Sequence, residues 1–290
     1  MQTERAEIAP ENSQADKPAA ATQPAPLTFL MVGCQRCGST WVDKALRGHP
    51  EIYTPPQKQT YFFDLHYDRG IDWYVTNFDG VQPGHKAVGE IATGYCLPHA
   101  IPRMAEHFPD VQLIMSMRNP IDRAYSFYQS RSAKFGWSSF DEAAEARPEI
   151  LERGRYIEQI ELLLKYYDRD RLLLLFYDDL KADDRSYLKS ILQFLQVDET
   201  FESKQIGKVV QVAIFPKLRR RLNRMGLSWA VDLVSKSPLG DLLRKRMKTS
   251  KIQRYKPMPD DLRARLVEYY KPLNDRLAAF AGRDLSHWNK

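Results

Sequence analysis

Two glycines five residues apart mark a candidate anion-binding loop. The run from Gly33 to Thr40, GCQRCGST, joins a short apolar stretch to a segment with helical spacing. Such glycines let the backbone curl until successive N–H groups converge on an anion at a helix N-terminus. The spacing matches ATP-binding loops, but Ser39 stands where those loops need lysine, and the nearest cation is Arg36. The alternative to a phosphate site is a glycine-rich turn without a ligand.

A second polar junction follows the apolar run at 111–117. Arg118 comes directly after that run, and Ser126 stands eight residues later in a segment that opens with Asn119 and Pro120, a typical helix start. Eight residues are about two helical turns, so Arg118 and Ser126 can face the same anion. Parallel sheets bind ligands at the carboxyl ends of their strands. The two motifs together therefore predict a ligand with two phosphate groups.

In these motifs the chain resembles the PAPS-dependent sulfotransferases, whose donor is 3′-phosphoadenosine 5′-phosphosulfate (PAPS). Its C-terminal part is similar to the heparan sulfate and carbohydrate branch, and the chain looks like a bacterial-type member. The resemblance covers nearly everything after residue 27 and implies PAPS as donor, with no metal. It implies that the donor is bound by the first loop, the second motif and a C-terminal basic loop: Arg36, Cys37, Gly38, Ser39, Thr40, Trp41, Arg118, Ser126, Lys251 and Arg254.

Sulfuryl transfer must offset charge that develops on the leaving phosphate and must remove a proton from the acceptor. We expect Arg36 to stabilise the bridging oxygen through its charge, because a guanidinium does not readily lose a proton. We expect Lys58 to orient the donor or the acceptor.

The catalytic base is displaced from its usual place. In the heparan sulfate relatives a glutamate stands three residues before a Phe-Phe pair, and the matching residue here is Gln59, before Phe62 and Phe63. We predict Glu90 as the base, because the end of its predicted strand should meet the same cleft. An alternative reading makes Glu90 a carboxylate that holds a loop or pairs with an arginine. Asp64 and His66 are the other candidate bases.

Apolar runs and helical periodicities alternate along the chain. Strands are predicted at 27–33, 87–93, 111–117 and 172–177, and helices at 39–46, from Pro120, around 156–167 and at 260–281. Strands that alternate with helices form parallel sheets with both faces covered. The predicted fold is α/β, a P-loop-like three-layer fold with a central, mostly parallel sheet flanked by helices.

The composition is that of a globular protein. Of 290 residues 43% are hydrophobic and 28% charged, and no apolar run is long enough to cross a bilayer. We predict a disordered tail at 1–26, which has no secretory signal, and a sulfotransferase domain at 27–290. The expected location is the cytoplasm.

Basic residues gather in a helical segment at 215–256. It holds thirteen Lys or Arg against two Asp, a local charge of +11 in a chain of net charge +6. Its part at 215–248 is amphipathic and is predicted either to lie on an anionic membrane surface, at the inner face, or to grip an acidic substrate. The other reading is a pair of core-covering helices with a solvated basic face. The expected acceptor is a glycan or a lipid-linked glycan, and no nucleic acid partner is expected.

Two other functions compete with sulfuryl transfer. A P-loop nucleotide kinase or NTPase would bind ATP with Mg²⁺, which the missing lysine and the lack of a strand ending in a metal-binding Asp oppose. A non-catalytic sulfotransferase-like protein would bind nucleotide without turnover, as Gln59 suggests. Cys34 and Cys37 have no second Cys or His pair at ligand spacing, so no metal site is expected.

Overall fold

The structure is a computed structural model that describes residues 27–208 and 257–290. The tail predicted at 1–26 and residues 209–256, with Lys251 and Arg254, lie outside the described residues. The predictions made for them, including the basic segment at 215–256, therefore stay predictions.

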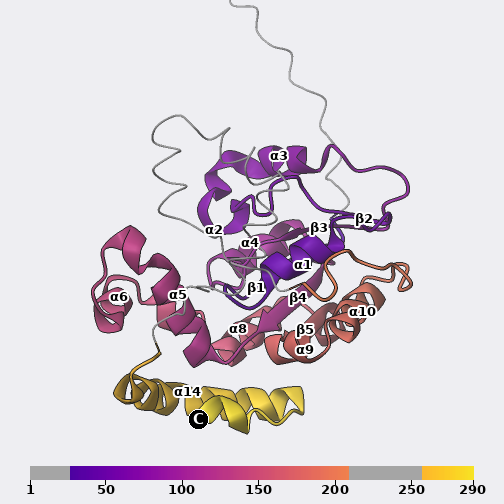
Figure 1. Ribbon diagram of the computed structural model, residues 1–290. Coiled ribbons are helices and arrows are strands. Elements are labelled where there is room, and N and C mark those ends of the chain that lie inside the picture. Colours follow the sequence, from indigo (N-terminus) through magenta and orange to yellow (C-terminus); the bar gives the residue numbers. More distant parts are fainter. Residues whose placement is uncertain (1–26, 209–256) are drawn as a thin grey trace, which may run out of the picture.

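A five-stranded parallel sheet forms the centre of the described chain (Figure 1). The strands lie in the order β2-β3-β1-β4-β5, and every neighbouring pair is parallel. Their bounds are β1 Phe29–Gly33, β2 Ile52–Tyr53, β3 Ala87–Ile91, β4 Gln112–Met117 and β5 Leu172–Phe176. The four predicted strands are confirmed. The edge strand β2 was not predicted, because two residues are too few to show a periodic pattern.

Helices cover both faces of the sheet. The side chains of Leu30 and Val32 pack on one face with residues of α2 (Phe62–Leu65), α3 (Gly70–Val75), α4 (Ala100–His107) and α8 (Tyr156–Leu163). Phe29 and Met31 point to the opposite face, where α1 (Ser39–Leu46), α9 (Tyr177–Ala182) and α10 (Asp184–Phe194) pack. A central strand is apolar on both faces because both are buried. The predicted three-layer α/β fold is confirmed.

A third helical cluster flanks the sheet. It joins α5 (Pro120–Phe135), α6 (Phe140–Ala146) and α7 (Glu149–Glu152) to the C-terminal helix α14 (Asp260–Ala281), which runs past α5 and α8 (Figure 1). Short 3₁₀ turns lie at Tyr67–Arg69, Thr76–Phe78, Arg169–Arg171 and Ser286–Asn289. As predicted, Asn119 caps α5: its side chain accepts a hydrogen bond from the Ile121 N–H. Among the described residues no helix combines the length and the apolar character needed to cross a membrane.

The sheet order places two loops beside each other. β1 lies between β3 and β4, so the connections that leave β1 and β4 emerge at the same carboxyl edge. The Cys34 N–H donates to the Ser116 carbonyl at 2.8 Å, which joins the two connections at their start. In open parallel sheets a crevice at such a change of strand order is the usual ligand site.

Candidate functional site

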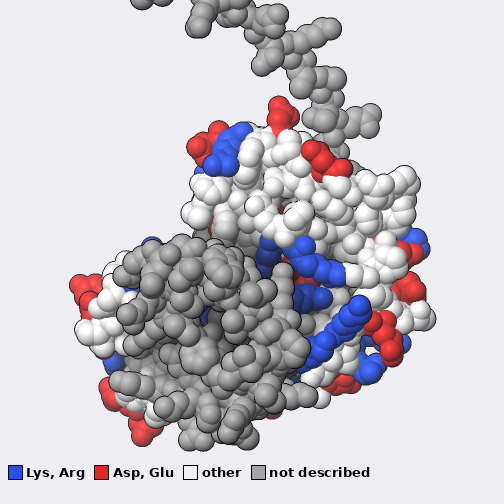
Figure 2. Space-filling view, turned by 45° about the horizontal axis from the view of Figure 1, so that its top comes forward, with Lys and Arg blue, Asp and Glu red and all other residues white. Residues whose placement is uncertain are grey.

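A cleft of about 1320 Å³ opens at this carboxyl edge. Its walls come from the loop after β1, the segment 58–61, the start of α5 and the α9–α10 turn. Lys and Arg side chains gather along the hollow that crosses this face of the molecule (Figure 2). The cleft-lining cations include Arg36, Lys58, Arg118, Lys181 and Arg263. The described walls are therefore suited to an anionic ligand.

The loop after β1 delivers two hydroxyls to the N-terminus of α1. Gly38 precedes α1 with φ 94°, a left-handed conformation that glycine adopts at little cost. Ser39 and Thr40 are the first two residues of the helix and both line the cleft. The N–H groups of a first helical turn have no partners within the helix and favour an anion. The predicted phosphate loop thus presents two hydroxyls and the N-terminus of a helix to the cleft.

Replacing Gly38 with alanine should weaken nucleotide binding. A Cβ at Gly38 would lie 2.8 Å from Leu180 Cδ2, and the left-handed backbone adds a cost of about 1–2 kcal/mol. Gly136→Ala is a matched control, because Gly136 also has a left-handed backbone (φ 79°) but an added Cβ would meet nothing within 4 Å. Both variants should unfold more easily in urea, but only Gly38→Ala should lose affinity for 3′-phosphoadenosine 5′-phosphate (PAP) in calorimetric titration. Equal PAP affinity in the two variants would contradict a phosphate role for the loop.

Lys58, from the segment 58–61, reaches the same hydroxyls. Its Nζ donates to Ser39 Oγ at 3.0 Å and to Thr40 Oγ1 at 3.1 Å. Burial lowers the pKa of Lys58 to about 8; Asp43 opposes this shift and Arg47 adds to it. The sequence led us to expect only an orienting role for Lys58, because nothing local shows that its segment folds against the loop.

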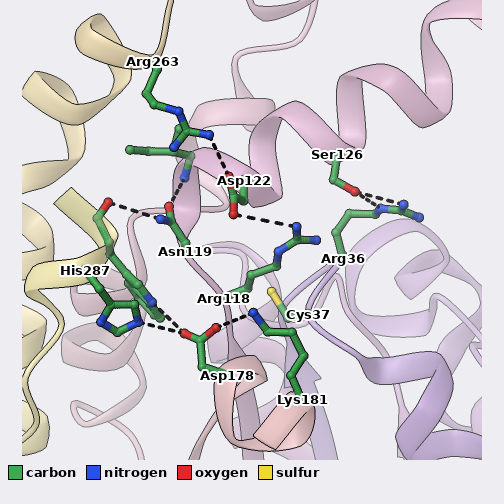
Figure 3. A network of polar contacts seen from close by, with 12 residues as sticks. Arg36, Cys37, Arg118, Asn119, Asp122, Ser126, Asp178, Lys181, Arg263 and His287 are labelled. Atoms are coloured by element: carbon green, nitrogen blue, oxygen red, sulfur yellow. Dashed lines mark hydrogen bonds and ion pairs between the residues drawn. The ribbon is translucent and has the colours of Figure 1, made fainter. Parts of the chain in front are cut away.

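On α5, Ser126 is contacted by Arg36 from the loop after β1 (Figure 3). The Arg36 guanidinium donates to Ser126 Oγ from both Nε (3.1 Å) and Nη2 (3.0 Å). Arg118 also lines the cleft: its Nη2 lies 4.0 Å from Asp122 Oδ2, and its guanidinium lies 5.3 Å from the centre of the Tyr177 ring. The structure thus brings Arg36 to Ser126, one of the two predicted 3′-phosphate residues, whereas Lys58 contacts the predicted 5′-phosphate hydroxyls.

Trp41 and Cys37 of the predicted donor-binding loop differ in their access to the cleft. Trp41 lines the cleft, although only 5% of its surface is exposed. Cys37 is fully buried and does not line the cleft; its carbonyl accepts a hydrogen bond from Ser116 Oγ at 2.7 Å. The position of Cys37 therefore favours a role in shaping the loop over a side-chain contact with a ligand.

Glu90, the predicted base, lies in the interior and does not line the cleft. Its carboxylate accepts hydrogen bonds from the Thr60 N–H and Oγ1 (3.1 Å) and from the hydroxyls of Tyr74 and Tyr95 (both 3.0 Å). Burial raises its pKa to about 7, against the opposing effect of these donors. Side chains alternate along a strand, and Glu90 shares the face of Val88, which α2 and α3 cover. The arrangement supports the alternative reading, a carboxylate that holds a loop.

The other two candidate bases also lie outside the cleft lining. The Asp64 carboxylate packs against Gly94 so closely that a Cβ there would lie 1.9 Å from Asp64 Oδ2, and burial raises the pKa of Asp64. His66 follows α2 and lies edge-on to Trp73, with ring centres 6.3 Å apart. A catalytic role of Asp64 or His66 therefore stays a prediction, and neither side chain lines the described cleft.

Gln59 does lie in the cleft wall, where the family's pattern has its glutamate. Its Nε2 donates to Thr93 Oγ1 at 3.0 Å. Within 27–208 and 257–290 no group of three or more His, Cys, Asp or Glu side chains is arranged to hold a metal ion.

Comparison with known proteins gives consistent matches. A family model described as "Sulfotransferase domain" matches residues 26–271. The human heparan sulfate glucosamine 3-O-sulfotransferase 6 is 24% identical over 264 residues, which cover 88% of this chain and 72% of that protein. The membrane-associated sulfotransferase kil1 of Dictyostelium discoideum is 30% identical over 103 residues, 34% of this chain but only 22% of that protein.

A solved structure supports the fold. The sulfotransferase from Alicyclobacillus acidocaldarius superposes with a TM-score of 0.68 at 24% identity, and the match covers 92% of this chain and 100% of that one. The family match spans most of the chain, including both anion-binding motifs and the strands that position them. The chain therefore belongs to the sulfotransferase family.

Proposed function

We propose that the chain transfers a sulfuryl group from PAPS to a hydroxyl or amine and releases PAP. The observation that carries this proposal is the pair of anion-binding groups in one cleft. Ser39 and Thr40, with Lys58, suit the 5′-phosphosulfate, and Ser126, with Arg36 and Arg118, suits the 3′-phosphate. A ligand with phosphates at both ends of one ribose engages both groups, whereas the linear triphosphate of ATP is usually bound with Mg²⁺ held by carboxylates.

The proposed acceptor is a carbohydrate or a glycolipid. Support comes from the name of the human relative, a heparan sulfate glucosamine 3-O-sulfotransferase, and from the cleft beside Gln59 and Tyr61. In-line transfer requires the acceptor atom to approach the sulfur opposite the leaving 5′-phosphate oxygen. The wall formed by 58–61 lies beside the loop hydroxyls and is the proposed place for the acceptor.

PAP should stabilise the protein much more than ATP with Mg²⁺ or adenosine 5′-phosphate. At a concentration of 100 times its Kd, PAP should add about 2.7 kcal/mol to the free energy of unfolding, visible as a raised Tm. Adenosine 5′-phosphate lacks the 3′-phosphate and should stabilise less. A scan in which saturating PAP leaves Tm unchanged, or in which ATP with Mg²⁺ exceeds PAP, would count against the proposal.

Gln59, at the position of the usual glutamate, favours a second candidate function, a non-catalytic nucleotide-binding protein. A turnover assay distinguishes the enzyme from such a protein. Radiolabelled donor, incubated with the chain and a panel of glycans, amines and alcohols, should give labelled product. Strong PAP binding without transfer to any acceptor class would favour the binding protein.

A further inference from the structure

We infer that Lys58 is a catalytic residue that gives its proton to the leaving 5′-phosphate oxygen of the donor and then accepts the proton of the acceptor. This inference rests on the proposed function. It assigns to one lysine the two tasks that the sequence led us to divide between Arg36 and Glu90.

The Lys58 ammonium lies at the start of α1. Its Nζ makes hydrogen bonds of 3.0 and 3.1 Å to the two hydroxyls at the start of α1, where the 5′-phosphate is expected. A group within hydrogen-bond distance of those hydroxyls is also within reach of an anion that they bind. The structure therefore holds a proton donor at the proposed leaving group.

Arg36 is poorly suited to the same task. Both its Nε and its Nη2 donate to Ser126, on the side of the proposed 3′-phosphate. A guanidinium also keeps its proton at any physiological pH, so it offers charge but no proton transfer.

The carboxylates of the described cleft lining are already engaged. Asp122 pairs with Arg263 at 3.3 Å, and Asp183 caps α10 by accepting from Ser186. Asp184 accepts a hydrogen bond from the Gly207 N–H at 2.7 Å. Glu90 is buried away from the cleft. Among the described cleft residues, we therefore prefer Lys58 to these carboxylates as the base.

The environment of Lys58 makes proton transfer accessible. Burial disfavours its charged form and lowers its pKa to about 8; the carboxylate of Asp43 opposes the shift, and the guanidinium of Arg47 adds to it. A lysine with a pKa near the working pH can both donate and accept a proton at low cost. A bound donor anion will favour the ammonium, which is the form that the first step needs.

The segment that carries Lys58 is anchored on the sheet. Two residues further on, Thr60 donates to Glu90 from its N–H and its Oγ1, and the intervening Gln59 donates to Thr93. Catalytic groups need such supporting contacts to keep their geometry. Glu90 thus acts as a positioning residue, through Thr60 and not through the reacting atoms.

The acceptor atom bonds to sulfur as the bond from sulfur to the bridging oxygen breaks, and that electron pair stays on the 5′-phosphate. The Lys58 ammonium gives one proton to this phosphate oxygen, and the resulting amine takes the proton of the acceptor. Lys58 ends as an ammonium, the acceptor carries the sulfuryl group, and PAP leaves with one added proton.

Three variants test the role of Lys58. Lys58→Ala and Lys58→Arg should both lower kcat at saturating donor by about 100-fold or more, within the range for general acid–base catalysis. Lys58→Arg should keep PAP affinity within about threefold of wild type, which also shows that it is folded. Lys44→Ala, on the exposed face of α1 and outside the cleft lining, is the control and should have wild-type kcat and affinity.

Each result has a distinct meaning. A near-wild-type kcat in Lys58→Arg would overturn the proton transfer. A near-wild-type kcat in Lys58→Ala would overturn any catalytic role of Lys58. In either case, normal PAP binding would leave the proposed function intact. If the wild-type chain binds no PAP, the proposed function fails first and this inference with it. The wild-type rate should also fall as pH rises above the pKa of Lys58 in the donor complex, and a rate that stays level there would contradict the role.

Discussion

Arg118→Ala should weaken PAP binding by roughly 10- to 100-fold, as expected for the loss of a charge-assisted contact worth about 1.5–3 kcal/mol. Arg118 lines the same cleft as Ser126, its guanidinium lies over the Tyr177 ring, and one quarter of its side chain is exposed. It is therefore accessible to the proposed 3′-phosphate. Adenosine 5′-phosphate lacks that group, so its affinity should change by no more than about twofold. Isothermal titration with both nucleotides measures the difference.

Two further variants sharpen this test. Arg118→Lys keeps the charge but loses the planar pair of donors, and should give an intermediate PAP affinity. Arg147→Ala removes an exposed arginine that pairs with Glu149 outside the cleft lining, and should leave both affinities unchanged. If Arg118→Ala weakened both nucleotides equally, Arg118 would serve the loop or the 5′ side and not the 3′-phosphate.

Glu90→Gln should remove a large part of the pH dependence of stability. The pKa of Glu90 is about 7 in the folded chain, raised by burial from the ordinary value of 4.5. Between these values the folded chain binds more protons than the unfolded chain, so the free energy of unfolding falls as pH rises from about 4.5 to about 7. The shift corresponds to about 3 kcal/mol over that window. The amide that replaces the carboxyl group cannot ionise, so the variant should lack this decline.

Urea denaturation at steps between pH 4.5 and 8 measures the effect as a difference between wild type and Glu90→Gln. The difference should change with pH below about 7 and become constant above it; a constant difference throughout would place the pKa of Glu90 near its ordinary value. Turnover provides a second readout. Because Glu90 lies outside the cleft lining, Glu90→Gln should lose less kcat than Lys58→Ala, and an equal loss with intact PAP binding would return Glu90 to the role of base.

Much of the fold follows from local patterns. The run at 29–33 is apolar throughout, as a strand covered on both faces must be, and Asn119 with Pro120 starts a helix by capping chemistry that involves only neighbouring residues. These signals predicted four strands and four helices that the structure confirms. The sequence did not predict strand β2, because β2 consists of two residues at the sheet edge and depends on its partner β3 for its conformation.

The sequence by itself determined that a glycine-bounded loop and an Arg–Ser motif follow two apolar strands, since the curl of a loop and the start of a helix depend on adjacent residues. Only the tertiary structure decided which charges meet which hydroxyls. Arg36 contacts Ser126 on α5, and Lys58 contacts Ser39 and Thr40, because the order of the strands folds separate segments onto one edge. We predicted that Glu90 meets the cleft because of its position along β3. The helices that pack on its face of the sheet bury the Glu90 side chain instead, and which face they cover depends on the tertiary structure.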